Sequence, residues 1–173
     1  MKYQETLKFS HPLIWLLMLP LILFFGYALV QQLILGQPVG SKPAPDHWLL
    51  IFALIPLLVT GLLALARLEL IIDEAGIHYR FFPFHLRVKT LYWESIEKVA
   101  LREYNALKEF GGWGIRINFS GNKAYNVMGD GGQGLEVVRK DGRKILFSVR
   151  NPQVIKQFLN ALSSKGRGIS LHN

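Results

Sequence analysis

Cysteine is absent from this 173-residue sequence, which excludes disulfide bonds, thiolate metal sites and a cysteine nucleophile. Charged residues make up only 18% of the chain while 50% is hydrophobic, a composition that excludes a disordered protein. The 16 glycines show no triplet period, so a collagen-like structure is excluded as well. What remains is an apolar, folded protein of one or two compact units with a net charge of +8.

Two long stretches contain no Asp, Glu, Lys, Arg or His: residues 12–36, which are 25 residues long, and residues 48–66, which are 19 long. A helix of roughly 20 apolar residues spans the hydrocarbon core of a bilayer, so we expect both stretches to be transmembrane helices. A cleaved signal peptide is the alternative for the first stretch, but the apolar region of a signal peptide is only about 7–15 residues long. The lack of ionisable residues argues against a transporter or channel.

The segment between these stretches, residues 37–47, contains three prolines and predicts a short external loop. The two helices then form an antiparallel hairpin with both chain ends on one side of the membrane. This loop has Lys42 against Asp46, whereas the flanks of the hairpin carry Lys2, Lys8, Arg67, Arg80, Arg87 and Lys89. The positive-inside rule therefore predicts a multi-pass membrane protein, with residues 1–11 as a cytoplasmic N-terminal segment and both termini cytoplasmic.

From residue 67 onward apolar and polar residues alternate, which is typical of β-strands. The expected strands are 68–72, 77–81, 86–89, 96–104, 113–119, 135–140 and 143–149. A break in the alternation at Glu97-Lys98 indicates a β-bulge, and Asp141-Gly142 indicates a tight hairpin turn.

A C-terminal amphipathic helix is expected from Asn151, a good N-cap, and Pro152, which suits the first helical position. Its apolar face reaches Leu162 and should cover an open edge or end of the strands. The segment 163–173 is rich in Ser, Gly, Lys and Arg, and we expect a flexible tail there.

About seven antiparallel strands followed by one capping helix describe a pleckstrin-homology-like (PH-like) split barrel over residues 67–162. The sequence resembles the bacterial PH-like domain of small membrane proteins with two N-terminal helices. The stretches that carry the resemblance are IHYRFFPFHLRVKTLYWESIEKV, LKEFGGWGIRI and KDGRKILFSV. The resemblance implies a fold and a membrane location but little mechanism. Inositol-lipid recognition is not implied, because the first strand–strand loop, residues 73–76, is acidic where lipid-binding members are basic.

Sequence motifs give no indication of an enzyme. Residues 129–134 fit the G-x-G-x-x-G pattern, but an alternating strand follows instead of the helix that binds a dinucleotide, so we expect a flexible loop. His78 and His85 have no acidic partner at a fixed spacing, which predicts packed or exposed rings rather than metal ligands. No Ser–His–Asp pattern is present. We therefore expect no catalytic residue, cofactor, metal or small-molecule substrate.

Basic and aromatic residues of the β domain are the candidates for contact with lipid or with a partner. Residues 67–173 contain 17 Lys and Arg against 10 Asp and Glu. The negative charge of the cytoplasmic leaflet attracts a basic sheet face. An exposed aromatic turn is suited to insertion into the lipid or into a partner protein. The candidate residues are Arg80, Phe82, Phe84, Arg87, Lys89, Lys98, Arg102 and Lys108. Nucleic-acid binding is disfavoured, because no recognition helix is evident.

The leading hypothesis is a non-enzymatic, membrane-anchored PH-like interaction module that tethers a partner protein at the cytoplasmic membrane. The chain is also expected to associate with a second copy of itself, through the domain or the helices. One alternative is a peripheral reader of anionic lipid headgroups through the basic sheet face. The other is an accessory subunit of a membrane enzyme or transporter whose site is completed by another chain.

Overall fold

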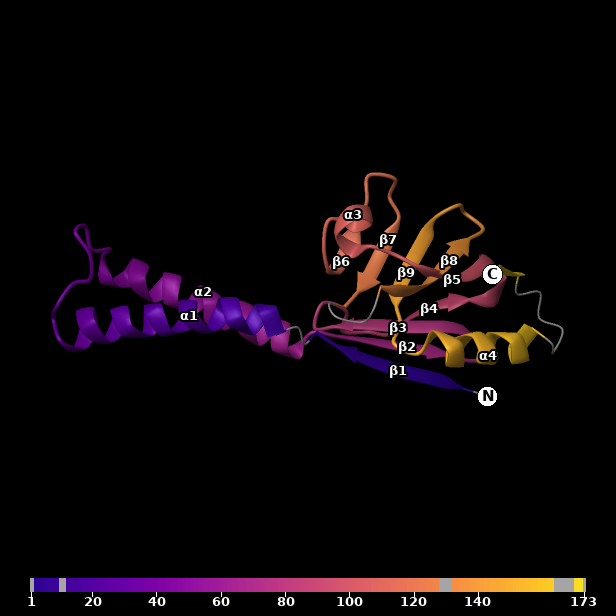
Figure 1. The fold of residues 1–173 in the computed structure, drawn as a ribbon, viewed down its shortest axis with the longest axis horizontal. Helices are drawn as coiled ribbons and strands as arrows, with labels where there is room; N and C mark the ends of the chain where they lie inside the picture. The colour runs from indigo at the N-terminus through magenta and orange to yellow at the C-terminus, as the bar shows by residue number, and fades with distance from the viewer. Residues whose placement is uncertain (1, 10–11, 128–131, 164–169, 173) are drawn as a thin grey trace. The chain divides into compact units, whose positions relative to one another are not determined.

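The computed structural model of the chain describes residues 2–9, 12–127, 132–163 and 170–172. Two compact units make up the protein (Figure 1): a helical unit, Ser10–Leu65, and a β unit formed by Met1–Phe9 together with Ala66–Asn173. The helical unit is therefore inserted into the β unit, which takes strands from both sides of it.

The helical unit consists of α1 (Pro12–Leu29), the π-helical turn η1 (Val30–Ile34) and α2 (Asp46–Leu65). Two segments are long and apolar enough to cross a membrane, Ile14–Ile34 and Asp46–Leu65, which confirms that the two stretches without charge form such helices. Most of their large apolar side chains are exposed, as expected for helices without a polar stripe.

The loop of the helical hairpin is closed by one polar side chain. Gln32 donates from Nε2 to the carbonyl oxygen of Ala44 and to the carboxylate of Asp46, each at 2.7 Å. These bonds join the end of the first helix to the start of the second and satisfy a polar amide in an otherwise apolar unit.

One sheet of the β unit, sheet A, is antiparallel with the strand order β1 (Tyr3–Lys8), β2 (Arg67–Ile72), β3 (Gly76–Phe82) and β4 (Lys89–Tyr92). Period-two alternation in β2 and β3 sends Leu68, Leu70, Ile72 and Ile77 into the core with no exposed surface.

Strand β1 lies within the N-terminal segment, where the alternation of apolar and polar residues does not predict a strand. The reason is Glu5, which occupies an inward position where the alternation calls for an apolar residue. Glu5 is buried, and its carboxylate accepts hydrogen bonds from the Tyr3 hydroxyl at 2.9 Å and from the Arg150 amide at 3.0 Å. Burial, and then the bond to Glu5, raises the pKa of Tyr3 well above its usual value. A buried polar side chain is tolerated here because hydrogen bonds satisfy it.

The second sheet, sheet B, has six strands in the order β10-β5-β8-β9-β7-β6. Their bounds are β5 Ile96–Glu103, β6 Gly114–Ile117, β7 Lys123–Asn126, β8 Gln133–Arg139, β9 Lys144–Ser148 and β10 Ser170–His172. The bulge in β5 is confirmed by a register shift between Ile96 and Lys98, and the β8–β9 hairpin around Asp141-Gly142 is confirmed as well.

The expected split barrel of about seven antiparallel strands is wrong in its count and closure. The described residues form ten strands in two separate sheets, and no ladder between those sheets closes a barrel. Two pairings, β7 with β9 and β10 with β5, are parallel. Such pairings join segments whose relative direction is not encoded in local alternation. Strand β10 lies where the sequence indicated a flexible tail, of which residues 164–169 are outside the described part.

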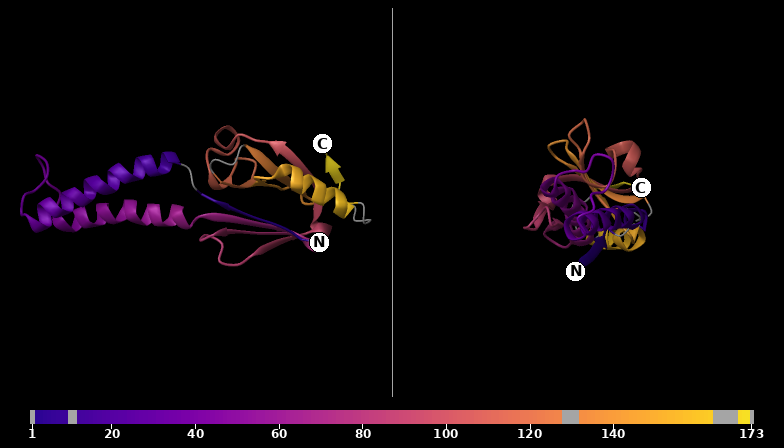
Figure 2. Two further views of the ribbon diagram at one scale, coloured as in Figure 1. Left: turned by 60° about the horizontal axis from the view of Figure 1, so that its bottom comes forward. Right: turned by 90° about the vertical axis from the view of Figure 1, so that its left-hand side faces the viewer.

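A single core joins the two sheets and the C-terminal helix. Helix α4 (Pro152–Ser163) begins at the predicted proline and buries Ile155, Leu159 and Leu162. Figure 2 shows this helix, in yellow, alongside the strands. Between the sheets, the ring of Tyr79 lies 5.0 Å from that of Tyr125 and 4.9 Å from that of Phe147. The expected mainly-β unit with a packed C-terminal helix is thus confirmed at this coarser level.

We predict that Gly76→Ala destabilises the β unit by roughly 3 kcal/mol or more, because a Cβ at this position would collide with the backbone of the neighbouring strand. The collision is with the carbonyl oxygen of Leu91, which cannot move without breaking the β3–β4 ladder. Thermal unfolding of the full-length protein in detergent, followed by near-UV circular dichroism, measures the loss. Ala75→Ser, at the exposed neighbouring position, is the control; equal melting temperatures for the two variants would contradict the prediction.

Candidate functional site

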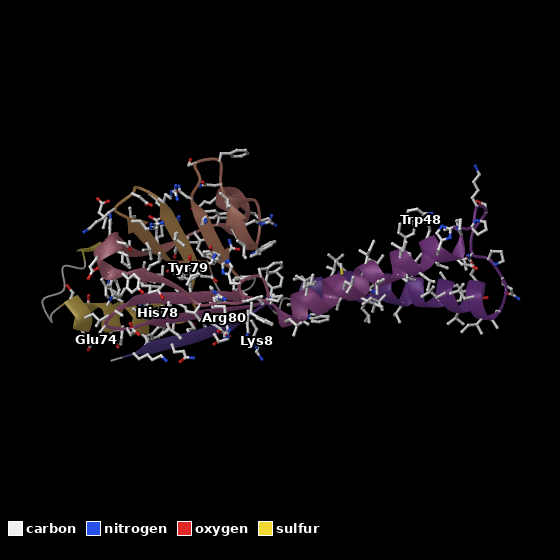
Figure 3. The ribbon with its side chains drawn as sticks, turned by 180° about the vertical axis from the view of Figure 1, so that it is seen from behind. Lys8, Trp48, Glu74, His78, Tyr79 and Arg80 are labelled. Atoms are coloured by element: carbon white, nitrogen blue, oxygen red, sulfur yellow. The ribbon has the colours of Figure 1, made fainter. Side chains whose placement is uncertain are left out.

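The candidate site is at the end of sheet A where the chain leaves for the helical unit and returns from it. Lys8 pairs with Arg67, Arg67 pairs with Phe82, and the amide of Phe9 donates to the carbonyl oxygen of Ala66 at 3.0 Å. Both connections to the helices therefore leave the β unit side by side. Figure 3 shows Lys8 at this end of sheet A and Glu74 at the opposite end.

The loop that follows β3 begins at the same end. Pro83, which lacks an amide hydrogen for the ladder, follows the last residue of β3. Three apolar side chains of the loop remain exposed: Phe84 by 61%, Leu86 by 78% and Val88 by 52%. They alternate with His85, Arg87 and Lys89. We call residues 83–89 the apolar–basic loop.

Positive charge on this loop is not neutralised. Within the described part of the chain, neither Arg87 nor Lys89 forms an ion pair with a carboxylate. Lys89 Nζ instead lies 3.1 Å from Nε2 of His85. Burial, followed by the charges of Lys89 and Lys123, lowers the pKa of His85 and so favours the neutral ring. The loop thus presents cations and apolar side chains together.

The predicted third strand, residues 86–89, begins too early. Strand β4 starts only at Lys89, while Leu86 and Val88 lie in the exposed loop instead of on a sheet face. Their alternation with Arg87 and Lys89 resembles that of a strand, but it belongs to an amphipathic loop. The alternation therefore predicts the apolar and basic character of this segment correctly, but the predicted strand is wrong.

Arg80, which was expected on an open basic face, is paired. Its guanidinium contacts the Glu69 carboxylate at 2.7 and 2.8 Å, and Arg67 contacts the same carboxylate at 2.9 Å. The guanidinium of Arg67 also lies 5.0 Å from the ring centre of Phe82. Glu69 therefore removes much of the positive charge from the outer face of sheet A, whereas Arg87 and Lys89 of the loop form no ion pair among the described residues.

Lys98, Arg102 and Lys108 belong to a different region, on β5 and the short helix α3 (Ala106–Phe110). Arg102 contacts the carboxylates of Glu109 and Glu136, each at 2.8 Å. Burial opposes the charge of Arg102, but the hydrogen bonds to these two carboxylates outweigh it and raise its pKa. The structure therefore places Phe82, Phe84, Arg87 and Lys89 at one end of sheet A and the other three residues on sheet B and α3.

His78 does have an acidic partner, contrary to the prediction from sequence. Its Nε2 lies 3.0 Å from Oδ1 of Asp73, and its Nδ1 lies 2.8 Å from Oγ1 of Thr90 on the neighbouring strand. Asp73 also accepts hydrogen bonds from the amides of Ala75 and Gly76 at 2.8 and 3.2 Å. The β2–β3 turn brings Asp73 back over His78, a contact that spacing along the chain does not reveal.

This Asp73–His78–Thr90 set acts as a clamp between a turn and two strands. The indole of Trp93 adds a further bond, from Nε1 to the carbonyl oxygen of Asp73 at 2.9 Å. Among the described residues, no three His, Asp or Glu side chains are grouped closely enough to hold a metal ion. Of the glycine-rich motif, residues 129–131 lie outside the described part, and β8 confirms that a strand follows it.

The lowered pKa of Asp73 predicts that the stability of the β unit depends on pH. Burial opposes ionisation, but the hydrogen bonds from His78, Ala75 and Gly76 outweigh burial and lower this pKa below its usual value. The ionised carboxylate therefore stabilises the fold above the unfolded pKa of about 3.9, and this contribution is lost as the pH falls through the lower, folded pKa. Asp73→Asn should lower the stability by about 1 kcal/mol at pH 7. In melting experiments between neutral and strongly acidic pH, the difference from wild type should shrink; a constant difference would contradict the assignment.

No protein-family model matches this chain, and a search among curated proteins gave no match either. A functional argument therefore depends on the site itself: the side-by-side connections to two apolar helices, and the unneutralised apolar–basic loop at the same end.

Proposed function

We propose that this protein is a non-enzymatic interaction module anchored in a bacterial cytoplasmic membrane. Helices α1 and α2 cross the bilayer as a hairpin, and the β unit lies on the cytoplasmic side with both termini. The exposed apolar side chains of both helices support this proposal, as does the excess of Lys and Arg outside the hairpin loop. The arrangement is also the one that the resemblance to bacterial PH-like membrane proteins implies.

The observation that carries the proposal is the apolar–basic loop at the end of sheet A from which the helices depart. Arg67 follows Leu65, the last residue of α2, by only two residues, which span roughly 7 Å of extended chain. A bilayer-spanning α2 therefore brings this end of the β unit to the lipid headgroups by covalent connection alone.

Contact with anionic lipid follows from the chemistry of the loop. Each basic residue near the negative cytoplasmic leaflet contributes about 1 kcal/mol, and Lys8, Arg87 and Lys89 are available at this end. Phe84, Leu86 and Val88 add apolar surface that gains by leaving water. The loop then fixes the orientation of the β unit at the membrane, and tethering raises its concentration toward membrane partners.

A second candidate function, a peripheral reader of anionic lipid, is favoured by the same free cations of Arg87 and Lys89. In that case lipid binding is the output of the protein instead of a means of orientation. The two functions differ in whether the full-length protein binds a protein partner when its loop contacts lipid.

Labelling of single cysteines tests the topology. Because the chain has no cysteine of its own, Ser41→Cys in the hairpin loop and Ala75→Cys in the β2–β3 turn each provide one reactive thiol. We expect a membrane-impermeant maleimide to label Ser41→Cys in intact cells, and Ala75→Cys only after the membrane is opened. The reverse pattern would indicate that the β unit lies outside the cell. Labelling of both residues in intact cells would contradict a hairpin that spans the membrane.

A polarity-sensitive fluorophore tests the lipid contact. Attached at Leu86→Cys of the full-length protein, it should brighten by roughly twofold or more in bilayers with anionic lipid relative to neutral bilayers. About 0.5 M salt should reverse most of the change, because screening then acts within a few Å. The effect should also disappear when Arg87→Glu and Lys89→Glu are combined.

The matched control is the same fluorophore at Ala75→Cys, which lies at the opposite end of sheet A, about 20 Å away along the strands. It should not respond to lipid charge. An equal response at both positions, or no response at Leu86→Cys, would rule out the loop as the lipid-contacting element.

A further inference from the structure

Strand β6 is the last strand of sheet B and presents an open edge. It pairs with β7 only, with Gly114 opposite Asn126 and Arg116 opposite Ala124. The amide of Asn118 donates to the carbonyl oxygen of Asn122 at 3.0 Å. This bond determines which residue pairs of the β6–β7 ladder are hydrogen-bonded and which are not. Gly114 and Arg116 therefore bond to β7, while the backbone groups of Ile115 and Ile117 point to the open edge.

A groove of about 470 Å³ lies beside this edge, lined by residues of α3 and of the β6–β7 hairpin. Figure 1 shows α3 next to β6. Three apolar residues that line it are exposed, Leu107, Ile117 and Phe119, with Ile117 exposed by 63%. An edge strand with exposed apolar side chains is a template for another strand, and folded proteins usually cover or charge such edges. In the described part of the chain nothing covers this one.

The wall of the groove formed by α3 is held in place. Asn105 caps the helix by accepting hydrogen bonds from the amides of Leu107 and Lys108 at 3.1 and 3.0 Å, and Gly111 ends it with a φ of 68°. The ion pair between Glu109 and Arg102 ties the helix to β5 at 2.8 Å. The groove is therefore preformed, which reduces the entropic cost of binding.

The groove carries positive charge without a balancing carboxylate. Lys108 and Arg116 line it, and neither forms an ion pair within the described residues. Its single acidic lining residue, Glu109, is already paired with Arg102. Burial opposes ionisation of Glu109, but the bonds from Arg102 and from the Asn105 amide outweigh it and lower its pKa, so this pairing persists at neutral pH.

We propose that the β6 edge and this groove bind an extended peptide segment of a partner protein, with alternating apolar and acidic residues, as an added strand. The inference rests on the proposed function and names the site through which the module holds its partner. The N–H and C=O groups of Ile115 and Ile117 bond to the peptide backbone. Apolar side chains of the peptide pack on Leu107 and Ile117, and its carboxylates meet Lys108 and Arg116.

Two other occupants fit less well. A second copy of the chain, pairing through its own β6, would bring the basic sequence GIRI to the same groove and add an Arg116 to an already positive surface. A bilayer would leave the open backbone groups of the edge without hydrogen-bond partners, which lipid cannot supply. An acidic, extended polypeptide satisfies both the backbone and the charge.

The test uses the full-length protein in single-copy nanodiscs and two pools of eight-residue peptides. In one pool Val, Ile, Leu or Phe alternates with Asp or Glu, and in the other the acidic positions are Lys. We expect retention of the acidic pool to exceed that of the basic pool by about tenfold or more. Ile117→Pro should abolish retention, since proline removes an edge-facing N–H without removing a bond to β7.

Lys108→Glu gives a second variant that does not depend on the strand, because this exposed side chain makes no ion pair that holds the fold. It should reduce retention of the acidic pool about tenfold, a loss of about 1.4 kcal/mol. Lys156→Glu on the exposed side of α4 makes the same change of charge away from the groove and should leave retention unchanged.

Retention of neither pool, equal retention of both, or retention that survives both Ile117→Pro and Lys108→Glu would overturn the inference. Capture of a second copy of the chain or of lipid at the groove, in place of the acidic pool, would overturn it too. Failure of the proposed function is read separately, from the labelling of Ser41→Cys and Ala75→Cys, so a correctly inserted protein that retains no peptide disproves only the peptide site.

Discussion

The ladder between β1 and β2 is the interaction on which the rest of the structure depends. It joins two segments separated by the entire helical unit, Tyr3–Lys8 and Arg67–Ile72, in continuous antiparallel register. Because of it, Phe9 and Ala66 lie side by side, and both helices depart from one end of sheet A. The same ladder brings Glu5 to the amide of Arg150, just before α4. One strand pairing thus brings the two connections to the helical unit together at one end of sheet A and helps to close the core.

Much of the fold could be predicted from local patterns, and the failures have physical causes. Uninterrupted apolar runs predicted the two long helices, and alternation predicted β2, β3, β5 and the β8–β9 hairpin. Strand β1 was missed because Glu5 interrupts its apolar alternation and is stabilised by partners distant in sequence. Strand β7, with four residues and a parallel neighbour, has too short a pattern to be recognised. The closed barrel failed because pairing between distant strands is a tertiary property.

For the candidate site, residue types could be predicted, but the pairing of charges could not. The sequence singled out Phe84, Arg87 and Lys89, which the structure places together on one loop. Counting charges suggested that Arg80 and Arg102 were equally free, yet each lies against a carboxylate supplied by a neighbouring strand or helix. The clamp between Asp73 and His78 was overlooked for the same reason. Net charge is additive along a chain, whereas available charge depends on which side chains meet in three dimensions.

Under the proposed membrane topology, the insertion of the helical unit between β1 and β2 links assembly of the sheet to the number of membrane crossings between them. During synthesis, β1 emerges first and waits until residues 67–72 follow some sixty residues later. In a membrane-inserted chain the two strands meet only when an even number of crossings separates them. If only one helix crossed the membrane, β1 would lie on the opposite side from β2. The inward-facing side chains of β2, from Leu68 to Ile72, would then lie beside an unpaired edge of sheet A. Under the proposed topology, β1 and β2 therefore pair only when the hairpin has inserted with both ends on one side, and a misinserted chain would expose an unfinished sheet to proteases.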